Sequence, residues 1–475
     1  MLEYASWIGN EWVPSKRLME VLNPYDGSVV GRVGIASAED LDRAVQAAAT
    51  AFESFRELPA YQRAEVLARA AQLIAEREEK LAQLLVREIA KPMRDARVEV
   101  RRAVNTFAVA AEEAKRIQGE MVPLDAVRGG EGRVAFTVRE PLGVIGAITP
   151  FNFPLNLVAH KVAPALAAGN TVVLKPASKA PLIAFELAQI LAEAGLPPGG
   201  LNVISGPGGE LGDRLVEDPR VAMITFTGSA EVGKKIRERA GLKRVTLELG
   251  SNSAVVIEDV QDLDRVVERC VQGAYTFAGQ VCISVQRIYV SERLYDPFLD
   301  RFKARVDALK TGDPAEEDTE LSAMISPGES ARVLEWIGEA QEGGARVETG
   351  GKMHGSIVLP TVLTSVQEEM KVCADEVFGP VAAVIPYCDF EEALAAVNRS
   401  RYGLQAGVFT QDLNKAFRAL KTLKVGGVMI NDIPSFRLDH MPYGGVKESG
   451  MGREGVPYAI QEMTELKLAV FNLEF

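Results

Sequence analysis

The sequence predicts an α/β protein with two doubly wound parallel-sheet domains and a small β arm. The first observation is that short apolar runs alternate with helical stretches over residues 144–249 and again over residues 254–430. Such alternation favours parallel sheets with helices on both faces. The second observation is that polar motifs follow the apolar runs, at the strand ends where such sheets bind ligands. These motifs are Pro150-Phe151-Asn152, Lys175-Pro176, Gly206-Pro207-Gly208, Thr227-Gly228-Ser229 and Glu248.

The N-terminal region reads as strands followed by helices. Residues 1–37 contain short alternating runs with Asn-Pro and Asp-Gly turns, which indicate strands. Over residues 38–119 apolar residues recur at helical spacing, so we expect amphipathic helices that pack on a sheet.

The first alternating region contains five expected strands, at residues 144–149, 171–174, 202–204, 222–226 and 245–249. No GxGxxG motif follows the first of them, and Gly206, Gly208 and Gly212 resemble that motif only loosely. The Gly228-Ser229 turn precedes a helix expected at residues 231–240, whose N-terminus favours a pyrophosphate group.

The second alternating region begins with expected strands at residues 254–258 and 286–290, separated by a helix that ends near residue 277. This region carries Cys282. Residues 122–138 are Gly-rich in the middle and alternate afterwards, which indicates either a projecting hairpin or a simple surface loop.

Composition excludes several classes of protein. The chain has 475 residues, 47% hydrophobic and 25% charged, as in an ordinary globular protein of two or three domains. A net charge of −12 without a basic run argues against nucleic-acid binding. The four cysteines are too scattered for a disulfide framework, and the three histidines have no metal-ligand spacing. We therefore expect no metal and no nucleic-acid partner.

Residues 141–159 carry no charge and have the length of a membrane span. Pro141, Pro150 and Pro154 instead favour a buried strand, a turn and the start of a helix. The N-terminus lacks a basic start followed by an apolar core, so we expect no secretory signal, no membrane partner and a cytoplasmic location.

The segment TFAGQVCISVQRIYV, residues 276–290, places Cys282 between a glycine-containing turn and an apolar run. A thiol on such a turn can enter a cleft, with backbone N–H groups facing the atom that it attacks. A buried structural cysteine fits the same window. Likewise, Glu248 at a strand end is either a general base with a raised pKa or an ion-paired residue.

Five windows in order together resemble the aldehyde dehydrogenase superfamily. They are PFNFP around Asn152, VLKPAS around Lys175, LELGSNS around Glu248, the Cys282 segment, and EVFGP around Glu376. The resemblance covers nearly the whole chain. It implies NAD(P)-dependent oxidation of an aldehyde to a carboxylic acid through a thiohemiacetal and a thioester, with an atypical Rossmann domain for the cofactor.

The resemblance also assigns catalytic roles. Cys282 is the expected nucleophile, and Glu248 the base that activates water for thioester hydrolysis. The Asn152 amide and the Cys282 backbone N–H are expected to stabilise the oxyanion. Lys161 and Glu454 match positions of a proton path behind Glu248, although each also suits an ordinary salt bridge.

For the cofactor, Lys175 and Glu376 resemble residues that hold the two riboses, and Phe378 packs near the nicotinamide. Many NAD-preferring relatives have Glu three positions after the lysine, where this chain has Ser178 followed by Lys179. Removing that carboxylate removes its repulsion of a 2′-phosphate, so NADP use is expected alone or beside NAD, unless Lys179 simply faces solvent. The other expected cofactor residues are Ile148, Thr149, Pro150, Phe151, Gly208, Phe226, Thr227, Gly228, Ser229, Val232, Leu249 and Gly250.

The substrate tunnel, by motif position, is expected to involve Arg102, Phe153, Asn156, His160, Val281, Ile283, Arg437 and Tyr443. The two arginines and the histidine favour a small polar or anionic aldehyde, of lactaldehyde, semialdehyde or glyceraldehyde-3-phosphate type. Phosphate-using relatives often carry Arg immediately before the nucleophile. Val281 stands there in this chain and weakens the glyceraldehyde-3-phosphate interpretation.

The resemblance further divides the chain into a dinucleotide-binding domain (1–119 and 140–250), a catalytic domain (251–455) and an oligomerisation arm (120–139 and 456–475). It also implies that the hairpin at residues 122–138 pairs with the C-terminal strand, residues 465–475. The apolar C-terminal strand, hazardous if exposed, favours a homodimer or homotetramer. Three alternatives remain: a coenzyme A-acylating dehydrogenase, disfavoured by Glu248; a Cys–His hydrolase, for which no histidine signature is present; and a non-catalytic protein on the same fold.

Overall fold

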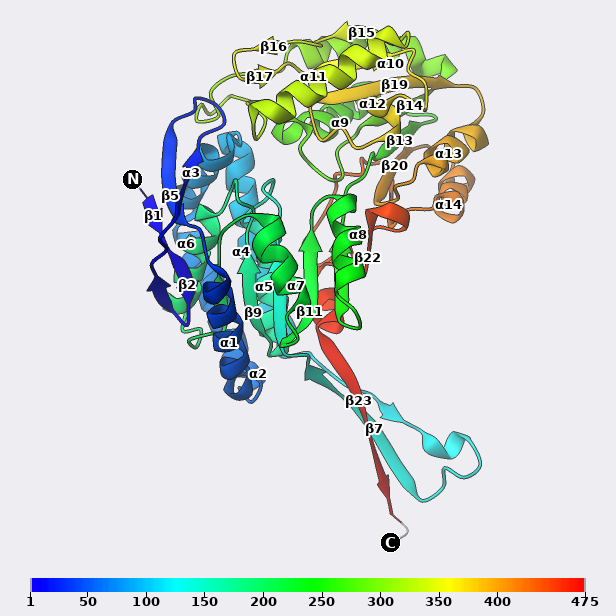
Figure 1. Ribbon diagram of the computed structural model, residues 1–475. Coiled ribbons are helices and arrows are strands. Elements are labelled where there is room, and N and C mark those ends of the chain that lie inside the picture. The colour runs from blue at the N-terminus through cyan, green and yellow to red at the C-terminus, as the bar shows by residue number, and fades with distance from the viewer. Residues whose placement is uncertain (1, 474–475) are drawn as a thin grey trace.

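The computed structural model describes residues 2–473 and consists of two large sheets with helices on both faces, a small N-terminal sheet and a projecting arm (Figure 1). The small sheet has the strand order β1 (Leu2–Tyr4), β5 (Val29–Gly34), β4 (Leu18–Leu22). The strands expected before residue 38 and the helices expected after it are confirmed.

The first large sheet has eight strands, and its five central strands are parallel. These five strands are the five apolar runs predicted from the sequence. Antiparallel strands add to both edges. The order is β22 (Gly450–Met451), β12 (Arg244–Glu248), β11 (Val221–Thr227), β8 (Val144–Ile148), β9 (Thr171–Lys175), β10 (Leu201–Val203), β2 (Ser6–Ile8) and β3 (Glu11–Val13).

Helices cover both faces of this sheet because successive residues of a strand point in opposite directions. In β9, Val172 and Leu174 face one apolar cluster, and Val173 faces another. The first cluster receives α2 (Ala60–Glu76), α3 (Glu78–Ile89), α4 (Met93–Glu113), α5 (Asn156–Ala168) and α6 (Leu182–Glu193). The second receives α1 (Ala38–Phe55), α7 (Asp213–Glu217) and α8 (Ala230–Arg239).

The second large sheet has seven strands, all parallel except β15 at one edge. Its order is β15 (Arg346–Thr349), β18 (Thr361–Thr364), β19 (Val381–Tyr387), β14 (Arg287–Ser291), β13 (Ala254–Ile257), β20 (Gln405–Phe409) and β21 (Gly427–Ile430). One face packs on α9 (Leu263–Tyr275), α10 (Glu292–Asp307), α11 (Pro327–Glu342) and α12 (Lys371–Ala374), and the other on α13 (Phe390–Arg399) and α14 (Leu413–Thr422).

The arm extends away from both sheets (Figure 1). Its strand β7 (Arg133–Pro141) pairs antiparallel with the short β6 (Met121–Val122) on one side and with β23 (Thr464–Asn472) on the other. The projecting-hairpin prediction is therefore confirmed, and the simple surface loop is wrong. The predicted pairing of this hairpin with the C-terminal strand is also present, although residues 474–475 lie outside the described part.

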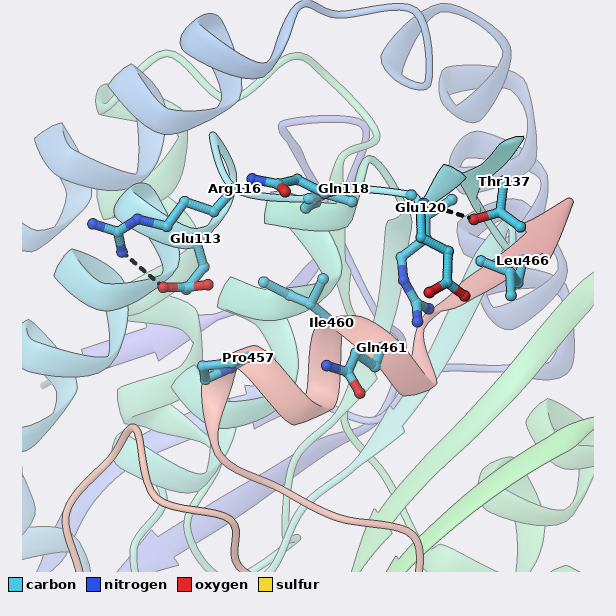
Figure 2. A pocket seen from close by; sticks show the side chains of 12 residues that line it. Glu113, Arg116, Gln118, Glu120, Thr137, Pro457, Ile460, Gln461 and Leu466 are labelled. Atoms are coloured by element: carbon cyan, nitrogen blue, oxygen red, sulfur yellow. Dashed lines mark hydrogen bonds and ion pairs between the residues drawn. The ribbon is translucent and has the colours of Figure 1, made fainter. Parts of the chain in front are cut away.

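A cavity of about 490 Å³ opens at the root of the arm, between the end of α4, β7 and α15 (Val456–Glu462) (Figure 2). Arg116, Arg139, Glu113 and Glu120 give it a mixed charged lining. The cavity includes neither Cys282 nor Glu248, so the chemistry expected from the sequence lies elsewhere.

Within residues 2–473, no helix has both the length and the apolar character needed to cross a bilayer. The uncharged residues 141–159 instead include β8 and the beginning of α5, and most of their side chains are buried. The prediction of a buried strand, turn and helix start is confirmed.

Candidate active site

The turn that presents Cys282 has a left-handed backbone. After α9, Phe277, Ala278 and Gly279 have φ angles of 48°, 53° and 68°. This region is unfavourable for a residue with a Cβ atom, and such strain clusters at functional sites. Gly279 must be glycine because a Cβ there would overlap the carbonyl oxygen of Gly379. The predicted glycine-supported turn is therefore present.

The Cys282 thiol points towards Tyr443 rather than into an apolar core. Its Sγ lies 2.8 Å from the Tyr443 hydroxyl oxygen. Burial raises the pKa of Cys282 to about 11, while the Tyr443 hydrogen bond and the charge of Arg437 oppose that rise. The resting thiol is thus protonated at neutral pH, and it must lose its proton to act as a nucleophile.

Glu248 ends β12 and is 2% exposed. Neither carboxylate oxygen has a hydrogen-bond partner within the described residues. Burial, and then the negative charge of Glu454, raises the pKa of Glu248 well above its usual value. The pKa shift has the direction expected from the sequence, and among the described residues Glu248 lacks the partner that the ion-paired alternative requires.

Asn152 follows β8 and connects the two halves of the site. Its Nδ2 donates to the Gln280 carbonyl oxygen at 2.9 Å, two residues before Cys282. Its backbone carbonyl accepts a hydrogen bond from the Lys91 ammonium at 2.7 Å. The amide has a second N–H, which donates to no group within residues 2–473.

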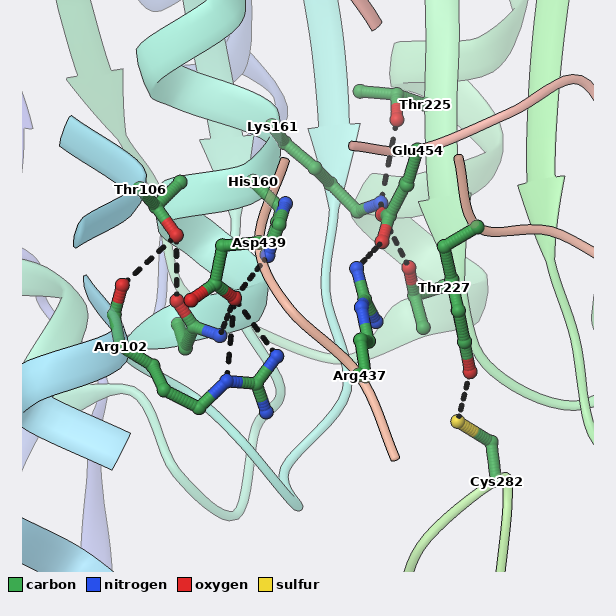
Figure 3. A network of polar contacts seen from close by, with 12 residues as sticks. Arg102, Thr106, His160, Lys161, Thr225, Thr227, Cys282, Arg437, Asp439 and Glu454 are labelled. Carbon is green, nitrogen blue, oxygen red and sulfur yellow. Dashed lines mark hydrogen bonds and ion pairs between the residues drawn. The ribbon is translucent and has the colours of Figure 1, made fainter. Parts of the chain in front are cut away.

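Lys161 and Glu454 form the buried pair that the sequence suggested. Lys161 Nζ lies 2.7 Å from Glu454 Oε1, and Arg437 donates to Glu454 Oε2 at 3.0 Å (Figure 3). Although burial opposes ionisation, Lys161 and Arg437 hold the pKa of Glu454 well below its usual value. This carboxylate stays charged while the neighbouring Glu248 tends to keep its proton.

Arg437 links this pair to the nucleophile. Its guanidinium lies 3.6 Å from the centroid of the Tyr443 ring, and its side chain is 6% exposed. Its Nε has no hydrogen-bond partner within the described residues. The buried guanidinium of Arg437 thus has an unused donor, and the ring of Tyr443 lies between it and Cys282.

Asp439 was missed in the sequence, although it follows Arg437 by two positions. Its Oδ1 accepts hydrogen bonds from Arg102 at 2.8 Å, from His160 at 3.0 Å and from Asn156 at 3.3 Å (Figure 3). Burial lowers the pKa of His160, as does the charge of Arg437, so this ring is neutral. The sequence analysis expected Arg102 and His160 to bind an anionic substrate. In the structure both side chains instead bind the internal carboxylate of Asp439.

The remaining expected tunnel residues supply apolar surface. Phe153 packs edge-on against Phe277, with ring centroids 6.5 Å apart. Ile283 is buried beside Tyr443, and Val281 packs against the same small cluster.

The expected ribose-holding residues lie at the ends of strands. Lys175 ends β9, and burial lowers its pKa to about 8. Among residues 2–473 its ammonium donates only to the carbonyl oxygen of Pro176, at 3.3 Å. Burial raises the pKa of Glu376 to about 7, and the Ser251 backbone N–H donates to it. At Gly250 a Cβ would overlap the Glu376 carboxylate, so glycine keeps this carboxylate close to the chain.

Other expected cofactor residues line the same edge of the first sheet. Ile148, Phe226 and Thr227 lie at the ends of β8 and β11, and Thr149, Pro150, Phe151, Gly228, Leu249 and Gly250 directly follow these strands and β12. Phe378, with φ 48°, packs edge-on against Phe151 at 5.8 Å. Ser229 caps α8 by accepting a hydrogen bond from the Val232 backbone N–H. This helix N-terminus and the buried Lys175 suit the phosphates and hydroxyls of a dinucleotide.

Ser178 and Lys179 are placed differently from one another. The Ser178 hydroxyl donates to the carbonyl oxygen of Gly206 at 2.9 Å, beside Gly208, and Lys179 is exposed. The hydroxyl hydrogen is thus already used, and the exposed Lys179 fits both a contact with a phosphate and the alternative in which it simply faces solvent.

Within residues 2–473, no group of three or more His, Cys, Asp or Glu side chains is placed to hold a metal ion.

Comparison with known proteins shows the family. Residues 12–469 match the aldehyde dehydrogenase family. The 3-sulfolactaldehyde dehydrogenase of Priestia megaterium is 48% identical over 471 residues, covering 99% of this chain and 98% of that protein. Two solved structures are similar throughout. Aldehyde dehydrogenase 21 from Physcomitrella patens, in complex with the reaction product succinate, has a TM-score of 0.98 and 42% identity, covering 100% of this chain and 99% of that chain. Glyceraldehyde-3-phosphate dehydrogenase from Methanocaldococcus jannaschii, complexed with NADP, has a TM-score of 0.93 and 40% identity, covering 96% of this chain and 100% of that chain.

The family match covers the five parallel strands of the first large sheet and all of the second, and it contains Asn152, Glu248 and Cys282. The fold class and the resemblance drawn from the five windows are confirmed, and the chain belongs to the aldehyde dehydrogenase family.

Proposed function

We propose that the protein oxidises a small anionic aldehyde to its carboxylic acid, with Cys282 as the nucleophile and NAD or NADP as the hydride acceptor. The proposal that the substrate is anionic rests on the position of Arg437. This buried guanidinium has a donor without a partner and covers the ring of Tyr443, whose hydroxyl contacts the Cys282 thiol. A carboxylate or sulfonate on a short aldehyde can meet that donor while its carbonyl carbon lies at Sγ.

In the first step the Cys282 thiol gives its proton to water, and the resulting thiolate attacks the aldehyde carbon. The electron pair of the C=O π bond moves to the oxygen, which gives the anion of a thiohemiacetal. The negative charge that develops on the former carbonyl oxygen is stabilised by the free N–H of Asn152 and by the Cys282 backbone N–H. When bound, the nicotinamide accepts a hydride from this carbon. Cys282 is then left as a thioester.

Thioester hydrolysis needs a base, and Glu248 is placed for that role. Ionised Glu248 takes a proton from water as the oxygen attacks the thioester carbon, and the acid and the free thiol are released. Lys161 and Glu454 lie near enough to Glu248 for their charges to act on its pKa, and we place them beside the path by which its proton leaves for solvent. Relatives that transfer the acyl group to coenzyme A usually lack an acid at this position, so a free acid is the proposed product.

The charges around the site support a single anionic group on the substrate. Asp439 neutralises Arg102, whereas the single carboxylate of Glu454 is shared between the two cations Lys161 and Arg437. These five groups therefore carry a net charge of +1 while Glu248 is protonated. The names of two similar proteins point the same way, since 3-sulfolactaldehyde and succinate are both small and anionic. Val281 keeps glyceraldehyde 3-phosphate the weaker candidate.

For the cofactor we propose NADP beside NAD. The support is the lack of an acidic side chain at Ser178, which precedes the cation Lys179, and a 40% identical structure complexed with NADP. The residues expected to hold it are Lys175, Glu376 and those at the ends of β8 and β11.

We also propose a homodimer or homotetramer assembled through the arm, with the domain boundaries given by the resemblance. Leu466, Leu468 and Val470 of β23 are 47%, 54% and 50% exposed, which favours burial by a second copy. The cytoplasm is the proposed location, in keeping with the four free cysteines.

The test is turnover across pairs of neutral and acidic aldehydes of matched length, with NAD and NADP run in parallel. Preference for the acidic member, loss of turnover in Cys282→Ala, and free acid rather than a coenzyme A ester as product are the expected results. Arg437→Leu should raise KM for acidic aldehydes at least ten-fold and change KM for neutral ones little. Equal effects on both members of a pair would contradict the anionic substrate, while oxidation itself would stand.

A further inference from the structure

Beneath the site lies a fully buried ion pair that the proposed mechanism does not use. Lys91, between α3 and α4, pairs with Glu99 of α4, and both side chains are 0% exposed. Burial lowers the pKa of Lys91, and the charge of Glu99 opposes that shift. Burying two charges costs free energy unless both find good partners, so the contacts of this pair indicate its role.

Glu99 fixes the start of the helix that follows Asn152. Its Oε1 accepts hydrogen bonds from the backbone N–H groups of Leu155 at 2.9 Å and Asn156 at 3.2 Å. A carboxylate at a helix N-terminus satisfies donors that have no partner within the helix. The beginning of α5, and with it the loop that carries Asn152, is therefore anchored to α4.

Lys91 contacts the loop and the nucleophile turn at once. Its ammonium donates to the Asn152 carbonyl oxygen at 2.7 Å and lies 3.8 Å from the centroid of the Phe153 ring. The same ammonium lies 4.6 Å from the centroid of Phe277, where the left-handed turn towards Cys282 begins. One cation thus bridges the two segments that supply the oxyanion donor and the thiol.

We propose that Lys91, paired with Glu99, is a positioning residue that sets where the Asn152 amide lies relative to Cys282. The inference rests on the proposed function, because it acts through the oxyanion donor. Lys91 holds the Asn152 backbone, and the Asn152 side chain then bonds to Gln280 in the Cys282 turn. Loss of the ammonium lets the loop and the turn separate, and the oxyanion loses a donor at the correct distance.

The test is a double-mutant cycle between Lys91→Met and Asn152→Ala. If Lys91 acts through Asn152, Lys91→Met should lower kcat/KM for the aldehyde at least ten-fold in the wild-type background. In the Asn152→Ala background it should lower kcat/KM less than two-fold, because the group that it positions is already gone. A merely structural role would give the same factor in both backgrounds.

Two further variants separate positioning from stability. Lys91→Met/Glu99→Gln removes the pair without leaving an unpaired buried charge, and it should show the same cycle as Lys91→Met. Glu88→Gln is the matched control. Glu88 is also buried and accepts hydrogen bonds from the first N–H groups of α6, at Leu182 and Ile183, but in the described part of the chain it bonds to neither active-site loop. Its kcat should equal the wild-type value at temperatures below the melting transition of both proteins.

Additive losses, wild-type rates in both pair variants, or a similar loss of kcat in Glu88→Gln would each overturn the positioning role. An Asn152→Ala enzyme with the wild-type rate would overturn it as well. Two other results would contradict the proposed reaction rather than the positioning role. They are turnover that persists in Cys282→Ala, and lack of turnover by the wild-type enzyme with every aldehyde of the panel.

Discussion

Glu248 and Glu454 are two buried carboxyl groups whose pKa values shift in opposite directions, and their different surroundings explain why. Glu454 has a lysine and an arginine at hydrogen-bond distance, whereas Glu248 has no hydrogen-bond partner in residues 2–473. A base that removes a proton from water must be ionised, and the raised pKa of Glu248 makes ionisation the pH-dependent event.

From this we predict that kcat rises with pH from neutral to alkaline values, because the ionised fraction of a carboxyl with a raised pKa grows as pH increases. Glu248→Gln should lower kcat by about 10²–10⁴-fold and remove that dependence. It should leave a burst of reduced nicotinamide, followed by an acyl adduct on Cys282 detectable by intact-protein mass spectrometry. If both the burst and the steady-state turnover were lost in Glu248→Gln, Glu248 would instead act before hydride transfer.

At the same scale, sequence reasoning located residues within motifs but not their distant partners. Cys282, Glu248 and Asn152 lie in recognisable windows, and burial of Glu248 could be expected from the apolar strand before it. Asp439 could not be assigned, because its partners Arg102 and His160 lie 337 and 279 residues away. Only the folded structure shows that the Asp439 carboxylate accepts hydrogen bonds from both side chains.

Among the elements, strands defined by apolar or alternating runs were predictable, and the two-residue strand β22 was not. β22 has two residues, too few for any period, yet its antiparallel pairing with β12 ties the segment after Arg437 to the first sheet. The turn after α9 was expected from Gly279. The left-handed conformation of Phe277 and Ala278 was not, because tertiary contacts rather than local preference impose it.

For this turn we predict that Gly279→Ala lowers kcat at least ten-fold and lowers the melting temperature. The added Cβ meets the Gly379 carbonyl oxygen, and the φ of 68° disfavours it, at a cost of about 1–3 kcal/mol. Gly328→Ala is the control, since a Cβ there meets nothing within 4 Å and the residue lies in α11. Wild-type kcat in Gly279→Ala would show that the turn tolerates displacement.

In the whole molecule, the arm is the feature that a single copy of the chain does not explain. Its apolar side chains remain exposed on both strands, including Val134 and Val138 of β7 at 39% and 37%. Pairing of β7 with β23 was expected only from family resemblance, since nothing local links segments so far apart in the chain.

We predict that Leu468→Lys/Val470→Lys shifts sedimentation at micromolar concentration towards a smaller species, because two charges would have to be buried against the second copy. Leu413→Lys, at a 70% exposed position on α14, should leave the sedimentation coefficient unchanged. An unchanged coefficient in the arm variant would mean that the apolar face of β23 is not the contact between copies.

The pairing of β7 with β23 also has a consequence for synthesis on the ribosome. Arg139 and Thr464, which hydrogen-bond at the root of the arm, are 325 residues apart. At about 5–20 residues per second, β7 waits roughly 16–65 s for its partner strand to be translated. During that interval one edge of the nascent hairpin is open to other chains on the same polysome, so chaperone cover during elongation, rather than stability of the finished fold, should govern the yield of active enzyme.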